Sequence, residues 1–334
     1  MEPAAVGIVG RSHETTNPLI PYSIVKISVI IPVYNAANFL RKAVESAVNL
    51  DEVKEILLVE DASTDNSLEL CRTLQTEYPK VKLFQHPDHG NHGAGATRNL
   101  GLEKATQEFI AFLDADDYYL PNRFEAEKEI FSNEKIEGVF NAIGTEFYTA
   151  KGKEEFQEKF KNIELTTVKK HAEGNDVFFG LLGLKNDFGT FFHLNGLTVR
   201  NISIRKNNLK FNENLRVHQD SDFIIKLAYH GHLKSGNITE AVAVRGVHDD
   251  NRITKIKQYS QLYNQRQFLL WDSVFQWSKD KDLPGKFRNN ILLKRRSFEL
   301  SLKKGWKKYV LFFLTAFFKP QILKTRYRFT VLKR

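Results

Sequence analysis

The sequence predicts an α/β fold in which a mostly parallel central sheet lies between two layers of helices. Three observations predict it. Short apolar runs alternate with segments whose apolar residues recur at helical spacing, which is typical of βαβ units. The runs are rich in Val and Ile on both faces, like the strands of buried parallel sheets. The 334-residue chain is 42% hydrophobic and 27% charged, a globular composition that excludes wholesale disorder.

The alternation runs from residue 26 to about residue 130. Residues 26–33 (KISVIIPV) are expected to form the first strand, and apolar residues at helical spacing follow over 39–48. Ser63 or Thr64 can cap a later helix. Beyond about residue 255 the chain is expected to be helical. The other expected elements are strands at 55–59, 81–84, 109–113, 197–204 and 241–247, and helices at 63–75, 95–105 and 222–229.

Acidic residues directly follow two of the predicted strands. Asp61 follows the second strand, and Asp114, Asp116 and Asp117 follow the fourth. Because ligands bind beyond the carboxyl ends of parallel strands, these acids predict a polar site at that edge of the sheet. Carboxylates at Asp114 and Asp116 suit a hard cation such as Mg²⁺ or Mn²⁺. The alternative is a solvated loop that caps the next helix, which is the role we expect for Asp117.

Four segments, in this order and spacing, resemble the family 2 glycosyltransferases of the GT-A fold. They are IIPVYNAANFL, VEDASTDNS, GATRNLGL and FIAFLDADD. The resemblance continues through VHQDSDF and RGVHDDNR, so it covers about residues 26–255. It implies a GT-A-like Rossmann-type fold and an inverting enzyme. Such an enzyme transfers a sugar from a nucleotide-sugar donor, here expected to be UDP-linked, to a hydroxyl of a saccharide or lipid-linked saccharide in cell-surface glycan synthesis.

The resemblance covers the middle of a chain that we expect to have three parts, the outer two inferred from composition and apolar pattern. Residues 1–25 would form a flexible leader, residues 26–255 the catalytic domain, and residues 256–334 a helical extension with a basic amphipathic tail. Within the catalytic domain, residues 26–120 would form the nucleotide-binding half and residues 121–255 the acceptor half.

Roles in donor binding are implied for five residues. The backbone around Pro32 and Tyr34 would line the uracil pocket, although Pro32 can also simply end its strand. Asp61 would contact the base; the residue before it is a glutamate where the family commonly has aspartate. Arg98 would steady the acidic pocket or the diphosphate, or form an ion pair on the helix surface. Asp114 would contact the ribose.

Metal binding and proton transfer are implied for three further positions. Asp116 would bind the cation, Mn²⁺ or Mg²⁺, which bridges the two phosphates. His248 either completes the metal site or lies in a loop near the phosphates. Asp220 matches the family's base, which takes the proton of the acceptor hydroxyl. It could also cap the following helix, and Asp222 is the weaker alternative for the base.

Charge is concentrated at the end of the chain. Residues 285–334 carry 15 Lys and Arg and one acid, whereas the rest carries 34 basic and 39 acidic residues. From 303 onward lysines are interleaved with Trp306 and several phenylalanines, a pattern that suits the surface of an anionic membrane. The alternative is a helix that packs its aromatic residues on the catalytic domain. Nucleic-acid binding is not expected, because the body is acidic.

The same sequence features favour the cytoplasmic side of the membrane. Cys71 is the only cysteine, so no disulfide can form within the chain. The longest apolar run, residues 309–318, is ten residues long, whereas a spanning helix needs about 20. We therefore expect a cytoplasmic protein that lies peripherally on the membrane's cytoplasmic face.

Two rival classes are open at this stage. One is a glycan- or nucleotide-sugar-binding protein without catalysis, which would have no need of a base at Asp220. The other is a nucleotidyltransferase, which also uses carboxylates and Mg²⁺ but releases pyrophosphate.

Overall fold

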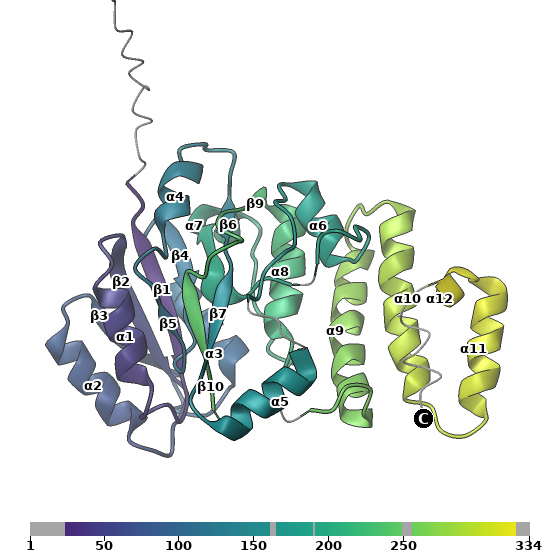
Figure 1. Ribbon diagram of the computed structural model, residues 1–334, viewed down its shortest axis with the longest axis horizontal. Coiled ribbons are helices and arrows are strands. Elements are labelled where there is room, and N and C mark those ends of the chain that lie inside the picture. Colours follow the sequence, from purple (N-terminus) through teal and green to yellow (C-terminus); the bar gives the residue numbers. More distant parts are fainter. Residues whose placement is uncertain (1–23, 161–164, 190, 249–255, 325–334) are drawn as a thin grey trace, which may run out of the picture.

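The computed structural model describes residues 24–160, 165–189, 191–248 and 256–324 (Figure 1). Nearly all of the leader expected at 1–25 lies outside these residues, as do the end of the RGVHDDNR segment and the last ten residues of the tail. Within the described residues, no helix is both long and apolar enough to cross a membrane.

A seven-stranded sheet forms the centre of the molecule, in the order β3-β2-β1-β4-β8-β6-β9. The first four of these strands run parallel, and β8 runs antiparallel to both of its neighbours. A small second sheet has the order β5-β10-β7. The strands are β1 (Ile27–Val33), β2 (Val53–Glu60), β3 (Val81–Gln85), β4 (Phe109–Phe112), β5 (Tyr118–Tyr119), β6 (Gly138–Phe140), β7 (Ile143–Phe147), β8 (Leu197–Arg200), β9 (Leu233–Ser235) and β10 (Ala243–Val247).

Helices cover both faces of the sheet because successive side chains of its strands point to opposite sides. Val29 and Ile31 pack in one core with α1 and α2, whereas Ile30 packs in the other with α3, α8 and α9. The helices are α1 (Leu40–Val48), α2 (Ser67–Glu77), α3 (Ala94–Lys104), α4 (Glu125–Ile130), α5 (Ala150–Phe160), α6 (Asn175–Leu181), α7 (Asn201–Lys206), α8 (Gln219–His230), α9 (Gln261–Lys279), α10 (Gly285–Ser301), α11 (Lys307–Phe318) and α12 (Gln321–Lys324).

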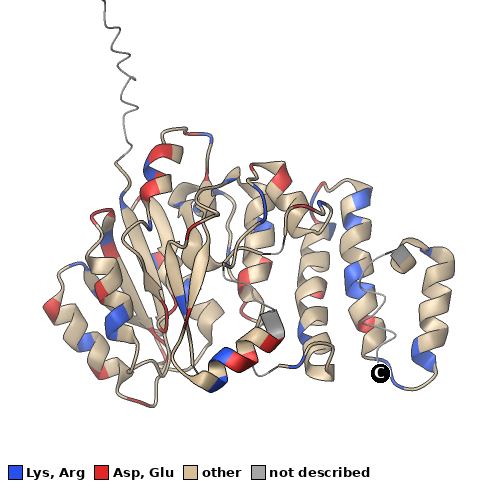
Figure 2. Cartoon of the chain, in the orientation of Figure 1, with Lys and Arg blue, Asp and Glu red and all other residues tan. Residues whose placement is uncertain are grey.

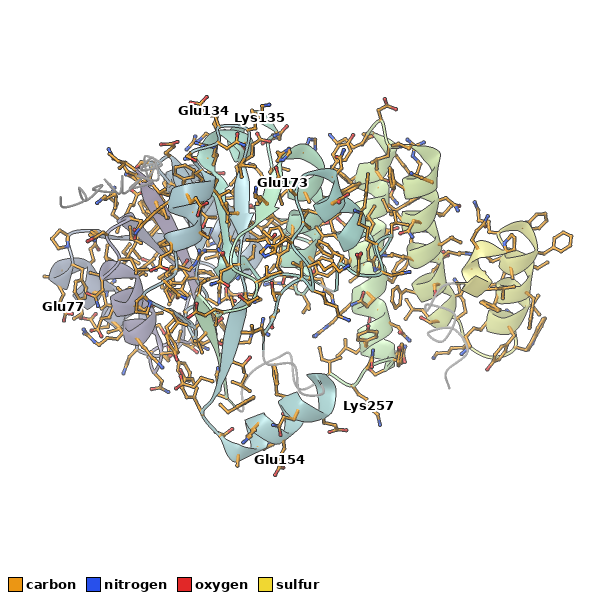
Figure 3. The ribbon with its side chains drawn as sticks, turned by 45° about the horizontal axis from the view of Figure 1, so that its top comes forward. Glu77, Glu134, Lys135, Glu154, Glu173 and Lys257 are labelled. Carbon is orange, nitrogen blue, oxygen red and sulfur yellow. The ribbon has the colours of Figure 1, made fainter. Side chains whose placement is uncertain are left out.

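The predicted α/β class with a mostly parallel sheet and a helical C-terminal region is confirmed. Charged side chains such as Glu77, Glu134 and Lys135 lie on the outside of the molecule (Figure 3). The prediction of a strand at 197–204 is wrong for its second half, since β8 ends at Arg200 and α7 begins at Asn201. Its partner β4 begins at Phe109, directly opposite Arg200, so pairing stops there.

A buried arginine fixes the connection that leads into β8. Arg123 is fully buried; its Nη1 donates to Glu127 Oε1 at 2.7 Å and its Nε to the carbonyl of Asn195 at 2.8 Å. Its Nη2 donates to the carbonyl of Leu197 and to Thr198 Oγ1. Arg123 therefore holds the short 3₁₀ helix η1 (Leu194–Gly196), whose Asn195 reaches the site described below.

Replacing Arg123 with methionine is expected to destabilise the fold by about 3–5 kcal/mol, because the buried carboxylate of Glu127 would lose its charged partner. Urea unfolding of the variant measures this loss. The double variant Arg123→Met/Glu127→Gln should recover part of the stability. Arg41→Met, which removes exposed ion pairs to Glu45 and Glu77, should cost less than about 1 kcal/mol. A single variant at Arg123 that unfolds like the wild type would contradict this account.

Candidate functional site

A cavity of about 500 Å³ opens where β1, β2 and β4 end. The three strands are parallel, so the residues after them meet at one edge; the N–H of Asp61 donates to the carbonyl of Val33. Seven of the eight residues singled out from the sequence line this cavity: Pro32, Tyr34, Asp61, Arg98, Asp114, Asp116 and His248. Asp220 is not among the lining residues.

The carboxylate of Asp61 is buried and organises the loop before α3. Its Oδ1 accepts from the backbone N–H of His92 at 2.7 Å, and its Oδ2 from that of Gly93 at 2.8 Å and from Asn91 Nδ2 at 3.0 Å. A carboxylate has about four acceptor positions, and near the fourth His86 Nε2 lies 3.6 Å from Oδ1. Gly93 has φ +85°, which disfavours a side chain at this close approach.

Arg98 and Asp114 form an ion pair in the wall of the cavity. Nη2 of Arg98 lies 2.5 Å from Oδ1 of Asp114, and the arginine is buried, so it is no surface ion pair. Burial works to raise the pKa of Asp114, but the positive charge of Arg98, helped by that of Arg245, outweighs it and holds that pKa below its usual value. Asp114 is therefore a carboxylate at neutral pH.

Asp116 and His248 lie side by side in the cavity wall. Oδ2 of Asp116 lies 3.3 Å from Nε2 of His248, and the imidazole stacks on Phe39 with ring centroids 4.6 Å apart. The backbone here is tightly packed: a Cβ on Gly246 would lie 2.5 Å from the carbonyl oxygen of Asp116. The β10 strand that carries Gly246 thus places His248 beside the acidic loop.

Asp117 does not cap a helix, contrary to expectation. The strand β5 follows it directly, and its carboxylate is buried. Oδ2 accepts from Asn195 Nδ2 at 2.5 Å and Oδ1 from the N–H of Gly246 at 2.9 Å. Burial, with the negative charges of Asp116 and Asp114, raises the pKa of Asp117 well above its usual value. This side chain ties the acidic loop to η1 and β10.

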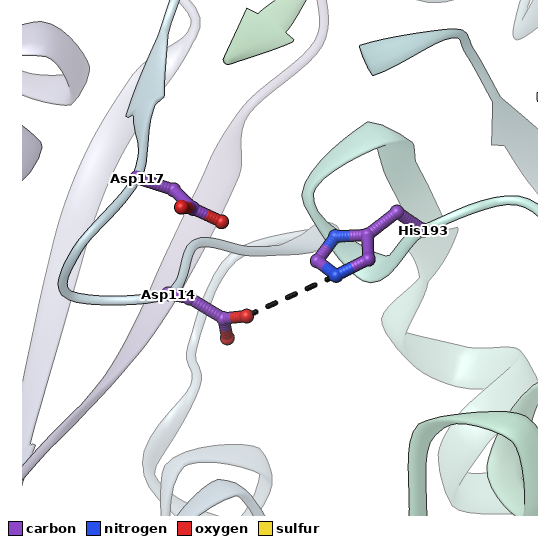
Figure 4. Close-up of side chains that lie close together, drawn as sticks. All are labelled: Asp114, Asp117 and His193. Atoms are coloured by element: carbon purple, nitrogen blue, oxygen red, sulfur yellow. Dashed lines mark ion pairs between the residues drawn. The ribbon is translucent and has the colours of Figure 1, made fainter. Parts of the chain in front are cut away.

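His193 completes the polar wall, and no motif in the sequence pointed to it. Figure 4 shows its ring facing Asp114, with Nε2 4.0 Å from Oδ2. Burial and the charge of Arg245 lower the pKa of His193 to about 4, so the ring is neutral at pH 7. The N–H of Asn195 donates to Nδ1, which places the single ring proton on Nε2. His193 therefore presents a hydrogen-bond donor toward Asp114 and the cavity.

Two further arginines line the cavity and were missed from the sequence. Arg216 and Arg245 form no ion pair with any of the residues that the structure describes. Both adjoin segments of the family resemblance, since Arg216 directly precedes VHQDSDF and Arg245 begins RGVHDDNR. That position is the signal by which they could have been found. Two such guanidinium groups suit a ligand with several negative charges.

The two candidate bases lie in the first turn of α8 and differ in their surroundings. Asp222 is fully buried; it accepts from Lys226 Nζ at 2.6 Å and from Ser273 Oγ at 2.7 Å, which is a structural role. Asp220 is half-buried, and its charge acts on the nearby His193. The cap position of α8 belongs to His218, so Asp220 is not the cap.

The structure offers two groupings that could hold a divalent cation. Ligand atoms of Asp114, Asp117 and His193 lie within 4.8 Å of one another. In that grouping, however, Asp114 is paired with Arg98 and His193 presents a proton rather than a lone pair. Asp116 and His248 place a carboxylate oxygen and a ring nitrogen 3.3 Å apart on the cavity wall. This donor pair fits Mn²⁺, and with the imidazole less readily Mg²⁺.

The fold, with its acidic loops at the sheet edge, is similar to the GT-A fold of known glycosyltransferases. The family comparison agrees: residues 28–192 match the model of glycosyl transferase family 2. The resemblance seen in the sequence is thereby confirmed.

Individual proteins are similar to the chain over limited stretches. The uncharacterized glycosyltransferase YibD of Escherichia coli is 42% identical over 101 residues, which are 30% of this chain and 28% of that protein. The minor teichoic acid biosynthesis protein GgaA of Bacillus subtilis is 29% identical over 208 residues, 60% of this chain and 42% of that one. The chain thus spans less than half the length of either relative.

A solved structure shares the fold. The structure of S. aureus TarS 1–349 in complex with UDP-GlcNAc superimposes with a TM-score of 0.59 at 19% identity and covers 86% of this chain and 78% of that one. At this identity the likeness establishes the fold and no more.

Proposed function

We propose that the protein transfers a sugar from a UDP-linked donor to a hydroxyl of a saccharide or lipid-linked glycan during synthesis of a cell-surface polymer. The observation that carries this proposal is the single cavity that joins Asp61, Asp114 and Asp116 to three arginines. The proposed substrate classes are those of two similar proteins: TarS, which shares the fold, was solved with UDP-GlcNAc, and GgaA is named for teichoic acid biosynthesis. Synthesis from such a donor would take place on the cytoplasmic side of the membrane.

The proposed donor contacts follow the cavity wall. The backbone at Pro32 and Tyr34 and the carboxylate of Asp61 receive the uracil, and Asp114 receives the ribose. The diphosphate binds the guanidinium groups of Arg216 and Arg245 in the cavity wall. His193 donates from Nε2 to an oxygen of the donor. The nucleotide half would be residues 26–120 and the acceptor half residues 121–255, although the central sheet takes strands from both.

Asp116 and His248 are proposed to hold the divalent cation. When bound, the cation would offset negative charge on the diphosphate of the departing nucleotide. The chain's own contribution is to hold the two ligands side by side, since Asp117 and Gly246 fix the loop and the strand that carry them.

Asp220 is proposed as the base of a single displacement. The acceptor oxygen forms a bond to the anomeric carbon on the face opposite the nucleotide, and the bond from that carbon to the phosphate oxygen breaks. The acceptor proton goes to the carboxylate of Asp220, and the nucleoside diphosphate leaves with the bonding electrons. The sugar is therefore transferred with inversion.

The test is a panel of nucleotide sugars, incubated with the full chain, Mn²⁺ and lipid-linked or free saccharide acceptors. We expect release of UDP from one donor and no pyrophosphate. Release of pyrophosphate would contradict the proposal and identify the protein as a nucleotidyltransferase. If calorimetry shows that a donor binds in Mn²⁺ but no donor is turned over, the chain is a binding protein. If no donor binds, the assignment of the cavity to nucleotide sugars is wrong.

A further inference from the structure

An exposed apolar stripe runs along one side of α11. The exposed fractions are 71% for Trp306, 65% for Phe313, 81% for Phe317 and 77% for Phe318. Val310 and Leu314 lie between them and are also exposed. Because these residues recur at steps of three and four, they share one face of the helix. Rings project outward from α11 in Figure 3.

The opposite side of α11 is already packed against the protein. Phe312 and Ala316 are buried in a small core with Leu293 and Leu300 of α10 and Ile322 of α12. Phe312 thus packs on the C-terminal extension itself and not on the catalytic domain, which was the expected alternative. The orientation of α11 is therefore fixed, with the stripe facing away from α10.

Lysines flank the stripe and acids are absent from it. Lys303, Lys304 and Lys307 are exposed in the turn before α11 and at its start, and the sequence has no acidic residue after Glu299. Blue segments of the ribbon mark lysines and arginines in α10 and at the start of α11, at the end of the molecule farthest from α2 (Figures 1 and 2). This positively charged surface therefore attracts an anionic partner.

We propose that the stripe and its lysines, Lys303, Lys304 and Lys307, dock on the surface of an anionic lipid bilayer. A large contiguous apolar patch is uncommon on the surface of a soluble monomer and marks an interaction site. A helix with aromatic residues on one face and lysines beside it lies in the membrane interface, with its apolar face among the acyl chains. The lysines lie next to the apolar face, where the lipid head groups would be. This inference stands independently of the proposed transfer reaction.

Sedimentation of the full chain with vesicles tests the proposal. Binding is expected to vesicles of phosphatidylcholine and phosphatidylglycerol in equal parts, weakly to phosphatidylcholine alone, and less at high salt. The variant Phe313→Ser/Phe317→Ser should bind at least about tenfold more weakly. Lys303→Gln/Lys304→Gln/Lys307→Gln should bind about a hundredfold more weakly. Emission of Trp306 should shift to shorter wavelength with the anionic vesicles, and Trp306→Phe should lose that shift.

A matched control replaces exposed apolar residues elsewhere. Leu184→Ser/Ile202→Ser changes two side chains that are 42% and 62% exposed, and it should bind vesicles like the wild type. The proposal is overturned if the Phe313/Phe317 variant is folded and still binds fully. It is also overturned if the chain ignores vesicles and forms a dimer that the same variant dissociates, because a second copy would then cover the stripe.

Discussion

Asp116→Ala is expected to lower Mn²⁺-dependent turnover of the donor at least about a hundredfold. The reason is geometric: Asp116 Oδ2 and His248 Nε2 lie 3.3 Å apart, and the variant removes one of the two groups that would share the cation. Calorimetry with the UDP-sugar should show tighter binding in Mn²⁺ than in EDTA for the wild type. For the variant the two affinities should be equal.

Two further variants make this result specific. His248→Ala should also reduce the difference between the donor affinities in Mn²⁺ and in EDTA. Asp88→Asn, which changes an exposed acid paired with His92 in the loop before α3, should leave it unchanged. If Asp116→Ala keeps its metal dependence while His193→Ala loses it, the cation binds instead among Asp114, Asp117 and His193.

The position of the site could be predicted from the sequence because it depends only on strand direction. Parallel strands bring their carboxyl ends to one edge whatever their exact limits, so Asp61 and Asp114 had to lie at the same edge of the sheet. The roles of single side chains depend on finer detail. A two-residue strand, β5, is too short to leave a periodic pattern, so Asp117 was expected to cap a helix that in fact begins later.

The other wall of the cavity could not be predicted, for a topological reason. β8 enters the sheet antiparallel, between β4 and β6, and so brings η1 against the end of β4. His193 and Asn195 reach Asp114 and Asp117 only through this insertion. Neither strand order nor an antiparallel insertion is encoded in the spacing of apolar residues. The buried bonds of Arg123 to this segment likewise appear only in three dimensions.

Asp220→Asn is expected to lower kcat by about 100- to 10,000-fold while leaving donor affinity close to that of the wild type. The amide keeps the size of the side chain but cannot take the acceptor's proton. Asp220 does not line the donor cavity, so the nucleotide contacts should survive. Single-turnover rates measure the chemical step, and calorimetry in Mn²⁺ measures the donor affinity.

Asp222→Asn is the matched control because it makes the same change two residues later in α8. Its carboxylate is buried against Lys226 and Ser273, so the variant should lower the melting temperature. The folded fraction should still turn over the donor far faster than Asp220→Asn. The reverse pattern would make Asp222 the base. Full turnover in both variants would mean that no residue of this helix takes the proton.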